Sequence, residues 1–236
     1  MNYQLHPLGD QAIIIDFGND INEETQQSVK TVVTLLEDHP PEWMIEYIPA
    51  FTTVALFYNP MKVPLHNNST IPYSIICEEI KKFLSNITSL KQIESRIVEI
   101  PVCYGGEFGP DLEEVARHNG LSTEDVITIH ANGDYLVYMI GFAPGFPYIG
   151  GMNERIATPR KATPRFKTPE GSVGIAGKQT GVYPIETPGG WQLIGKTPLK
   201  LFRPHEVQPS LLLAGDKIRF KPISLDEYRE LEAKQC

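Results

Sequence analysis

Five cations stand close together in the middle of an otherwise acidic chain, with no acid among them. They are Arg155, Arg160, Lys161, Arg165 and Lys167. Prolines at 159, 164 and 169 keep the segment extended and out of a helix. A guanidinium is planar and donates hydrogen bonds in pairs, so it suits a carboxylate or a phosphate. The pattern predicts an anion site built on Arg160 and Arg165, with a solvated basic loop as the equal alternative.

Polar side chains that suit a bound carboxylate or amide occur on both sides of this segment. Gln179 and Thr180 offer an amide and a hydroxyl. His130 ends a predicted helix; such a histidine is usually only a favourable charge at a helix C-terminus, and acid-base catalysis is the alternative. We therefore expect catalytic roles for Arg165, Gln179 and His130, and substrate binding by Arg160, Thr180, Tyr183 and Tyr104.

Aromatic residues alternate with glycines between residues 141 and 197, as in GFAPGFPYIGG and PGGWQ. Glycine lets another backbone or a ligand approach closely, and aromatic rings offer flat apolar surfaces. Any single ring is more often part of a core. Together the rings predict a groove in which Phe142, Phe146 and Trp191 face a partner.

Common catalytic motifs are incomplete in this sequence. The phosphate-loop pattern fails around Gly177-Lys178, because Ser172 and Gln179 replace its first glycine and its hydroxyl residue. A nucleophile elbow at Ser172 fails because Glu170 replaces its first glycine. The six histidines and three cysteines show no metal-ligand spacing, so we expect no metal site.

Charge and hydropathy narrow the class of protein further. The formal net charge is −8, with a pI of about 5.3, which argues against nucleic acid as a main partner. No basic segment followed by an apolar one opens the chain, so we expect no signal peptide. The uncharged run 135–153 contains two prolines and four glycines, which is poor for a membrane-spanning helix. These features predict a soluble, cytoplasmic protein.

The elements that position these residues fall into two predicted domains. Strands are expected at 3–8, 12–17, 43–48 and 53–58, and helices at 22–38 and 71–87. The order β-β-α-β-β-α predicts a small α+β domain over 1–92, one sheet with helices on one face. The best linker candidate is Ser85–Ser95.

Residues 93–236 are expected to form a mostly-β domain. A strand at 97–103 precedes two short helices, with Asp111 and Glu114 as the capping pair of the first helix and Ser122 and Asp125 as that of the second. Short strands separated by Gly and Pro turns follow, including 172–175, 181–185 and 191–194. The last strand is expected at 217–220, before a helical tail from Leu225.

The longer motifs resemble the KipI / PxpB family, also called allophanate hydrolase subunit 1. They are EIPVCYGGEFGPDLEEVA, GFAPGFPYIGG, TPRKATPR and GSVGIAGKQTGVYPIETPGGWQLIGKTP. The likeness extends from LGDQAIIIDFG near the start to LLLAGDKIRF near the end, so it covers nearly the whole chain.

This resemblance implies a cyclophilin-like β-barrel for the second domain. It also implies a role as the B component of an ATP-dependent 5-oxoprolinase, which with the A and C components converts 5-oxo-L-proline to L-glutamate. ATP is used by the complex, and this chain alone is expected to be inactive.

The family resemblance implies an alternative role, inhibition of a sporulation sensor histidine kinase by binding its dimerisation and phosphotransfer helices. Arg160, Arg165, Gln179 and Thr180 suit a carboxylate and a lactam, which slightly favours the enzyme. A prolyl isomerase rests on fold analogy alone.

Overall fold

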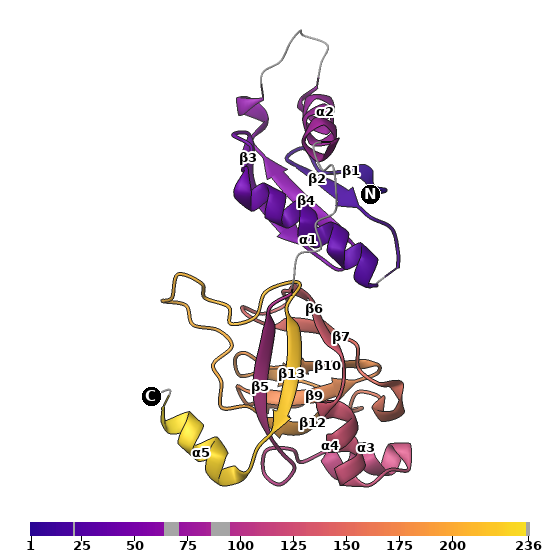
Figure 1. The fold of residues 1–236 in the computed structure, drawn as a ribbon, viewed down its shortest axis with the longest axis vertical. Coiled ribbons are helices and arrows are strands. Elements are labelled where there is room, and N and C mark those ends of the chain that lie inside the picture. The colour runs from indigo at the N-terminus through magenta and orange to yellow at the C-terminus, as the bar shows by residue number, and fades with distance from the viewer. Residues whose placement is uncertain (21, 64–70, 86–94, 235–236) are drawn as a thin grey trace. The chain divides into compact units, whose positions relative to one another are not determined.

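The computed structural model describes residues 1–20, 22–63, 71–85 and 95–234. They form two compact units, Met1–Glu94 and Ser95–Cys236 (Figure 1). The predicted linker Ser85–Ser95 lies mostly outside the described residues, and so does the predicted boundary near residue 92.

The first unit is a four-stranded antiparallel sheet with two helices. Across the sheet the strands are β1 (Gln4–Leu8), β2 (Ala12–Asp16), β4 (Thr53–Tyr58) and β3 (Met44–Pro49). The helices are α1 (Glu23–Asp38) and α2 (Pro72–Ser85), and the 3-10 turn η1 (Pro60–Lys62) follows β4. The chain order of strands and helices is the predicted one.

One face of this sheet carries the core of the first unit. Ile13 of β2 and Val54 of β4 pack in one cluster with Val32 of α1 and Ile76 of α2. Because side chains alternate between the two faces of a strand, both helices lie against the same face. Helix α1 begins where the sequence predicts, since the Asn22 side chain accepts a hydrogen bond from the Thr25 N–H.

The second unit is built on a closed seven-stranded barrel, in the order β10-β7-β6-β13-β5-β12-β9. The strands are β5 (Ile97–Tyr104), β6 (Tyr135–Ile140), β7 (Pro147–Gly150), β9 (Ser172–Ala176), β10 (Gln179–Val182), β12 (Gln192–Lys196) and β13 (Lys217–Pro222). Strands β5 and β13 pair in parallel, and the other neighbours pair antiparallel. The barrel confirms the mostly-β prediction, whereas its cyclophilin-like character stays a prediction.

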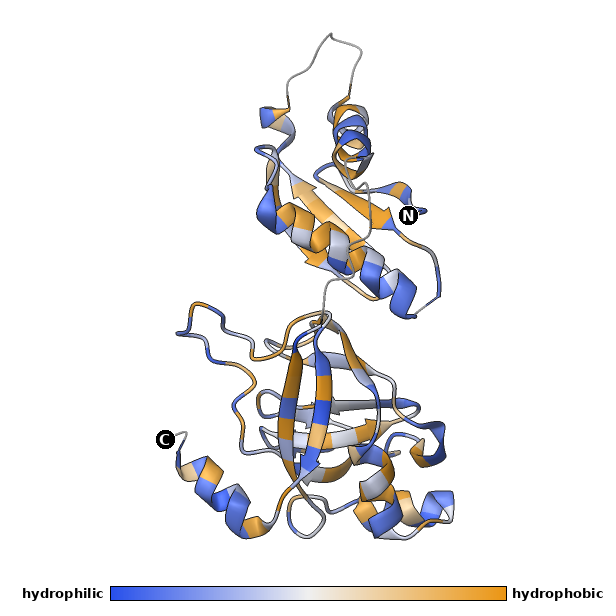
Figure 2. Cartoon of the chain, in the orientation of Figure 1, coloured by the Kyte–Doolittle hydropathy of each residue, from blue (hydrophilic) through white to orange (hydrophobic). Residues whose placement is uncertain are grey.

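Side chains fill the interior of the barrel. Along β13 the apolar residues Ile218 and Phe220 are buried and alternate with cations, an alternation visible in Figure 2. They belong to one cluster with residues of the other strands, including Ile100, Val137 and Val173. A small barrel packed in this way has a solid core, so a ligand must bind at its surface or rim.

Shorter elements surround the barrel. They are α3 (Leu112–Asn119), α4 (Thr123–Ala131), η2 (Glu154–Ile156), the paired strands β8 (Arg165–Thr168) and β11 (Thr187–Gly189), and α5 (Leu225–Ala233). The predicted capping box of Ser122 and Asp125 opens α4. The predicted cap at Asp111 is wrong: its side chain makes no capping hydrogen bond. Within the described residues, no helix has the length and apolar character needed to cross a membrane.

Candidate functional site

The predicted groove aromatics divide into a buried cluster and one exposed ring. Phe146, Tyr183 and Trp191 are 4%, 3% and 9% exposed, and their rings meet edge to face with centroids 5.8–6.2 Å apart. Gly181 permits this packing, because a Cβ there would lie 2.9 Å from Cζ3 of Trp191. Phe142 is 76% exposed. The expectation that all three partner-groove residues face a partner is therefore corrected: Phe146 and Trp191 lie in the cluster, and Phe142 is an exposed ring at its edge, meeting Phe146 edge to face with centroids 5.6 Å apart.

Phe142 is held outward by a tight turn between β6 and β7. Its φ is +68°, and it is the only non-glycine residue with positive φ among those described. Backbone hydrogen bonds from Gly141 N to Phe146 O and from Phe146 N to Ala143 O close the turn at 3.0 and 2.9 Å. An aromatic residue in this conformation carries strain, which the turn must offset.

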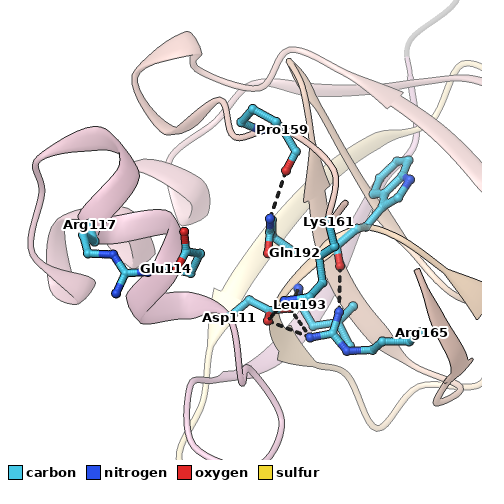
Figure 3. A network of polar contacts seen from close by, with 9 residues as sticks. Asp111, Glu114, Arg117, Pro159, Lys161, Arg165, Gln192 and Leu193 are labelled. Carbon is cyan, nitrogen blue, oxygen red and sulfur yellow. Dashed lines mark hydrogen bonds and ion pairs between the residues drawn. The ribbon is translucent and has the colours of Figure 1, made fainter. Parts of the chain in front are cut away.

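Asp111, between β5 and α3, is the centre of a charged network (Figure 3). Arg165 Nη2 donates to both carboxylate oxygens at 2.6 Å, and Lys161 Nζ donates at 2.9 Å. The backbone N–H of Leu193 completes the set at 2.7 Å. Burial by itself raises the pKa of Asp111, but the hydrogen bonds from Lys161, Leu193 N–H and Arg165 outweigh it and hold that pKa below its ordinary value.

This network changes the interpretation of Arg165. The sequence predicts a guanidinium free for a substrate anion, because its own segment holds no acid. In the structure the acid comes from Asp111, 54 residues earlier, and Arg165 Nη1 also donates to the Trp191 carbonyl at 3.1 Å. Arg165 thus joins the aromatic cluster to the Asp111 network. Its predicted catalytic role is not supported by this geometry.

His130, on α4, packs against Phe220 of the barrel core in a second polar network. It is fully buried, and its Nε2 and Nδ1 lie 2.8 Å from Thr180 Oγ1 and 2.7 Å from Tyr104 Oη. Thr180 donates its proton to the Gly174 carbonyl, so it accepts from His130 Nε2–H, and Nδ1 accepts from Tyr104. Burial lowers the pKa of His130 to about 3.

Both nitrogens of His130 and the hydroxyl protons of Tyr104 and Thr180 are therefore engaged. A neutral imidazole with both nitrogens occupied and no exposed surface cannot take a proton from a substrate without opening the barrel. The structure brings the predicted residues Tyr104, His130 and Thr180 together in one network, in which His130 and Thr180 are fully buried and Tyr104 is partly buried. The predicted acid-base role of His130 and the predicted substrate contact of Thr180 are not supported by this burial, and a substrate contact of Tyr104 stays a prediction.

The remaining predicted residues lie outside the barrel core. Gln179 is exposed at the first position of β10. Arg160 is exposed. Burial raises the pKa of Tyr183, and the positive charges of Arg160 and Arg165 oppose that rise. The opposing charges place Arg160, Arg165 and Tyr183 in one region. The sequence analysis missed Lys161 as a partner of Asp111 and missed Gln192 altogether.

Gln192, on β12, is 6% exposed. Its Nε2 donates to the Pro159 carbonyl at 3.0 Å, whereas its Oε1 accepts no hydrogen bond from a described residue. Among the described residues, no group of three or more His, Cys, Asp and Glu side chains lies close enough together to hold a metal ion. The arrangement offers cations and an amide, and so suits binding of an anion that also has a hydrogen-bond donor.

Comparisons with known proteins agree over most of the chain. Residues 3–212 match the family described as carboxyltransferase domain, subdomain C and D. The chain is 55% identical to the B component of 5-oxoprolinase from Bacillus subtilis, covering 97% of this chain and 96% of that protein. It is 42% identical to the B component of 5-oxoprolinase from Escherichia coli O157:H7, covering 91% and 94%. The crystal structure of TTHA0988 aligns with a TM-score of 0.76 at 34% identity, covering 91% of this chain and 40% of that longer one.

Proposed function

This chain belongs to the carboxyltransferase subdomain C and D family and, within it, to the B components of 5-oxoprolinase, and we propose that it acts as the B component of an ATP-dependent 5-oxoprolinase. The single observation that carries the proposal is the 55% identity over 97% of the chain to the Bacillus subtilis protein. Together with the A and C components, the chain would convert 5-oxo-L-proline to L-glutamate.

The reaction opens a lactam. The amide C–N bond breaks, water supplies the new carboxyl oxygen and the proton on nitrogen, and ATP hydrolysis to ADP and phosphate drives the step. A lactam is a poor electrophile, so its carbonyl must be held in place and its carboxylate kept fixed during the attack. In this proposal the chain holds the substrate, and the A and C components complete the reacting centre.

Two features of the second unit support a binding role. The buried histidine has both nitrogens engaged, and the guanidinium of Arg165 is paired with Asp111. These groups hold the barrel and its basic segment in position. Arg160, in contrast, is exposed and forms no ion pair with a described residue, so it is available to an anion.

Reconstitution tests the proposed function. Glutamate release from 5-oxo-L-proline is measured with ATP for this chain alone, for the A and C components together, and for all three. We expect turnover only in the complete mixture. Full activity of the A and C components without this chain, or turnover by this chain alone, would contradict the proposed role. Size-exclusion chromatography of the mixture confirms that assembly occurred.

The alternative role, inhibition of a sensor histidine kinase, stays a prediction. The structure changes the residue that tests it. Trp191 is buried in the aromatic cluster, so its replacement would disturb the fold, whereas Phe142 is exposed and reachable by a partner. If the chain inhibits a kinase through this surface, Phe142→Ala should lose kinase binding while its melting temperature stays unchanged.

A further inference from the structure

A cavity of about 380 Å³ lies beside the Asp111 network, between α3 and the segment 158–163. Glu114 and His118 line it from α3, Arg160 and Lys161 from the segment, and Gln192 from β12. This volume falls in the range of roughly 300–1,000 Å³ that small-molecule sites occupy.

The side-chain amide of Gln192 has a fixed orientation, which leaves its oxygen without a hydrogen-bond donor among the described residues. Donation from Nε2 to the Pro159 carbonyl fixes the orientation of the amide, because a flipped amide would set two oxygens against each other. Oε1 is then the free atom, and no described residue donates to it. Figure 3 shows this amide between Pro159 and Asp111, on the side of the network nearest Glu114 and Arg117. A buried acceptor without a donor is costly, so the cavity favours a ligand that brings an N–H or O–H group.

The charges of the cavity lining indicate which charged group a ligand would carry. Glu114 is neutralised by its ion pair with Arg117, and Lys161 shares its charge with Asp111. Arg160 forms no ion pair within the described parts of the chain. The uncompensated charge of the lining is therefore positive, and a planar guanidinium favours a carboxylate.

We propose that this cavity is the substrate subsite of the chain, where a cyclic amide acid binds with its carboxylate on Arg160 and its ring N–H on Gln192 Oε1. In 5-oxo-L-proline the carboxylate and the N–H are attached to the same carbon, so one small ligand satisfies both. The inference rests on the proposed function for the identity of the ligand. It adds Gln192, which no catalytic motif in the sequence singles out, as the residue that recognises the amide.

The test uses the reconstituted complex and a pair of ligands that differ in one group. Binding of 5-oxo-L-proline and of its lactone analogue, 5-oxotetrahydrofuran-2-carboxylate, is measured by calorimetry without ATP. The lactone has a ring oxygen in place of N–H. A site that uses this N–H should bind the lactone at least about 100-fold more weakly in the wild type. In Gln192→Leu, the ratio of the two affinities should approach one.

Arg160→Ala tests the carboxylate contact without touching the core, because Arg160 is exposed. We expect KM for 5-oxo-L-proline to rise at least about tenfold, with kcat nearly unchanged, since the contact holds substrate and transition state alike. Arg155→Ala is the matched control: it removes an exposed arginine of the basic run 155–167 that does not line the cavity, and it should leave KM unchanged.

The outcomes separate this inference from the proposed function. An inactive wild-type complex would contradict the proposed function and, with it, the ligand named here. An active complex in which Arg160→Ala keeps its KM would overturn the subsite alone. Equal binding of lactam and lactone by the wild type would show that the ring N–H does not reach Oε1 and would overturn the role of Gln192. This last comparison needs no mutation, so a folding defect in Gln192→Leu cannot hide the result.

Discussion

The second unit contains two polar networks that differ in how completely their hydrogen bonds are satisfied. Between α4 and the barrel, Tyr104, His130 and Thr180 form a chain in which each donor meets an acceptor. Elsewhere in this unit, Asp111 gathers two cations and a backbone N–H, while nearby Gln192 Oε1 has no donor among the described residues. A buried network whose hydrogen bonds are all made stabilises a fold. A network beside a cavity that lacks a donor offers a ligand a hydrogen bond that adds to its binding affinity.

The same comparison separates cations that hold the protein together from one that is free to bind. Arg165 and Arg160 belong to one basic segment and look equivalent in the sequence. Arg165 is held by Asp111 and the Trp191 carbonyl, so it fixes the segment. Arg160 lines the cavity without an ion pair to a described residue. Substitutions of the two arginines should therefore have effects of different kinds: on stability for Arg165, and on substrate affinity for Arg160.

Asp111→Ala should have the largest effect on stability. It leaves the Leu193 N–H and two cations without their acceptor in a partly buried place, which should cost about 2–4 kcal/mol in the free energy of unfolding. Urea denaturation of the full chain measures it. Asp226→Ala, an exposed acid in the first turn of α5, is the control and should cost under about 1 kcal/mol. Equal losses in both variants would mean that the network does not organise this unit.

His130 should make the barrel sensitive to acid. The pKa of His130 is about 3 in the folded state, against an ordinary value of 6.5, so the unfolded state takes up the proton first as the pH falls. Its contribution to stability is complete above about pH 6.5 and is lost as the pH falls toward 3. Between pH 7 and pH 4.5 the wild type should lose about 2–3 kcal/mol on this account.

The variant His130→Phe isolates that loss, because all other titrating groups are shared with the wild type. Its unfolding free energy should be lower at pH 7 but should fall less steeply with acid. Parallel pH profiles for the two proteins, from urea titrations at both pH values, would contradict a neutral buried histidine. They would mean that His130 takes up a proton in the folded state as readily as in the unfolded state.

Arg165→Lys should have the smallest effect of the three. Lysine keeps the charge beside Asp111 but loses the planar fork and the hydrogen bond to the Trp191 carbonyl. We expect a loss of about 1 kcal/mol in stability, and no more than roughly a fivefold fall in kcat/KM of the complex. A fall of a hundredfold or more in kcat/KM with stability intact would mean that Arg165 contacts the substrate. It would contradict the distinction between a structural Arg165 and a substrate-binding Arg160.

Much of the fold follows from local signals in the sequence. The β-β-α-β-β-α order of the first unit, the Asn22 cap and the Ser122 capping box are all observed where the pattern predicts them. Each depends on residues within a few positions of one another, such as hydrophobic periodicity or a side chain reaching the next turn. The same short-range information located the Gly-rich region and its basic segment.

The tertiary structure decided which of those residues face a ligand. Asp111 and Arg165 are 54 residues apart, and their pairing exists only because the fold brings the start of α3 and strand β12 beside the first residue of β8. Packing of α4 against the barrel also buried His130, and the turn between β6 and β7 left Phe142 exposed while Trp191 is buried. Burial and charge pairing depend on contacts between distant segments, which periodicity and spacing do not encode. For that reason the sequence identified Arg160 as a candidate, and only the packed barrel distinguished it from Arg165 and added Gln192, which the sequence did not single out.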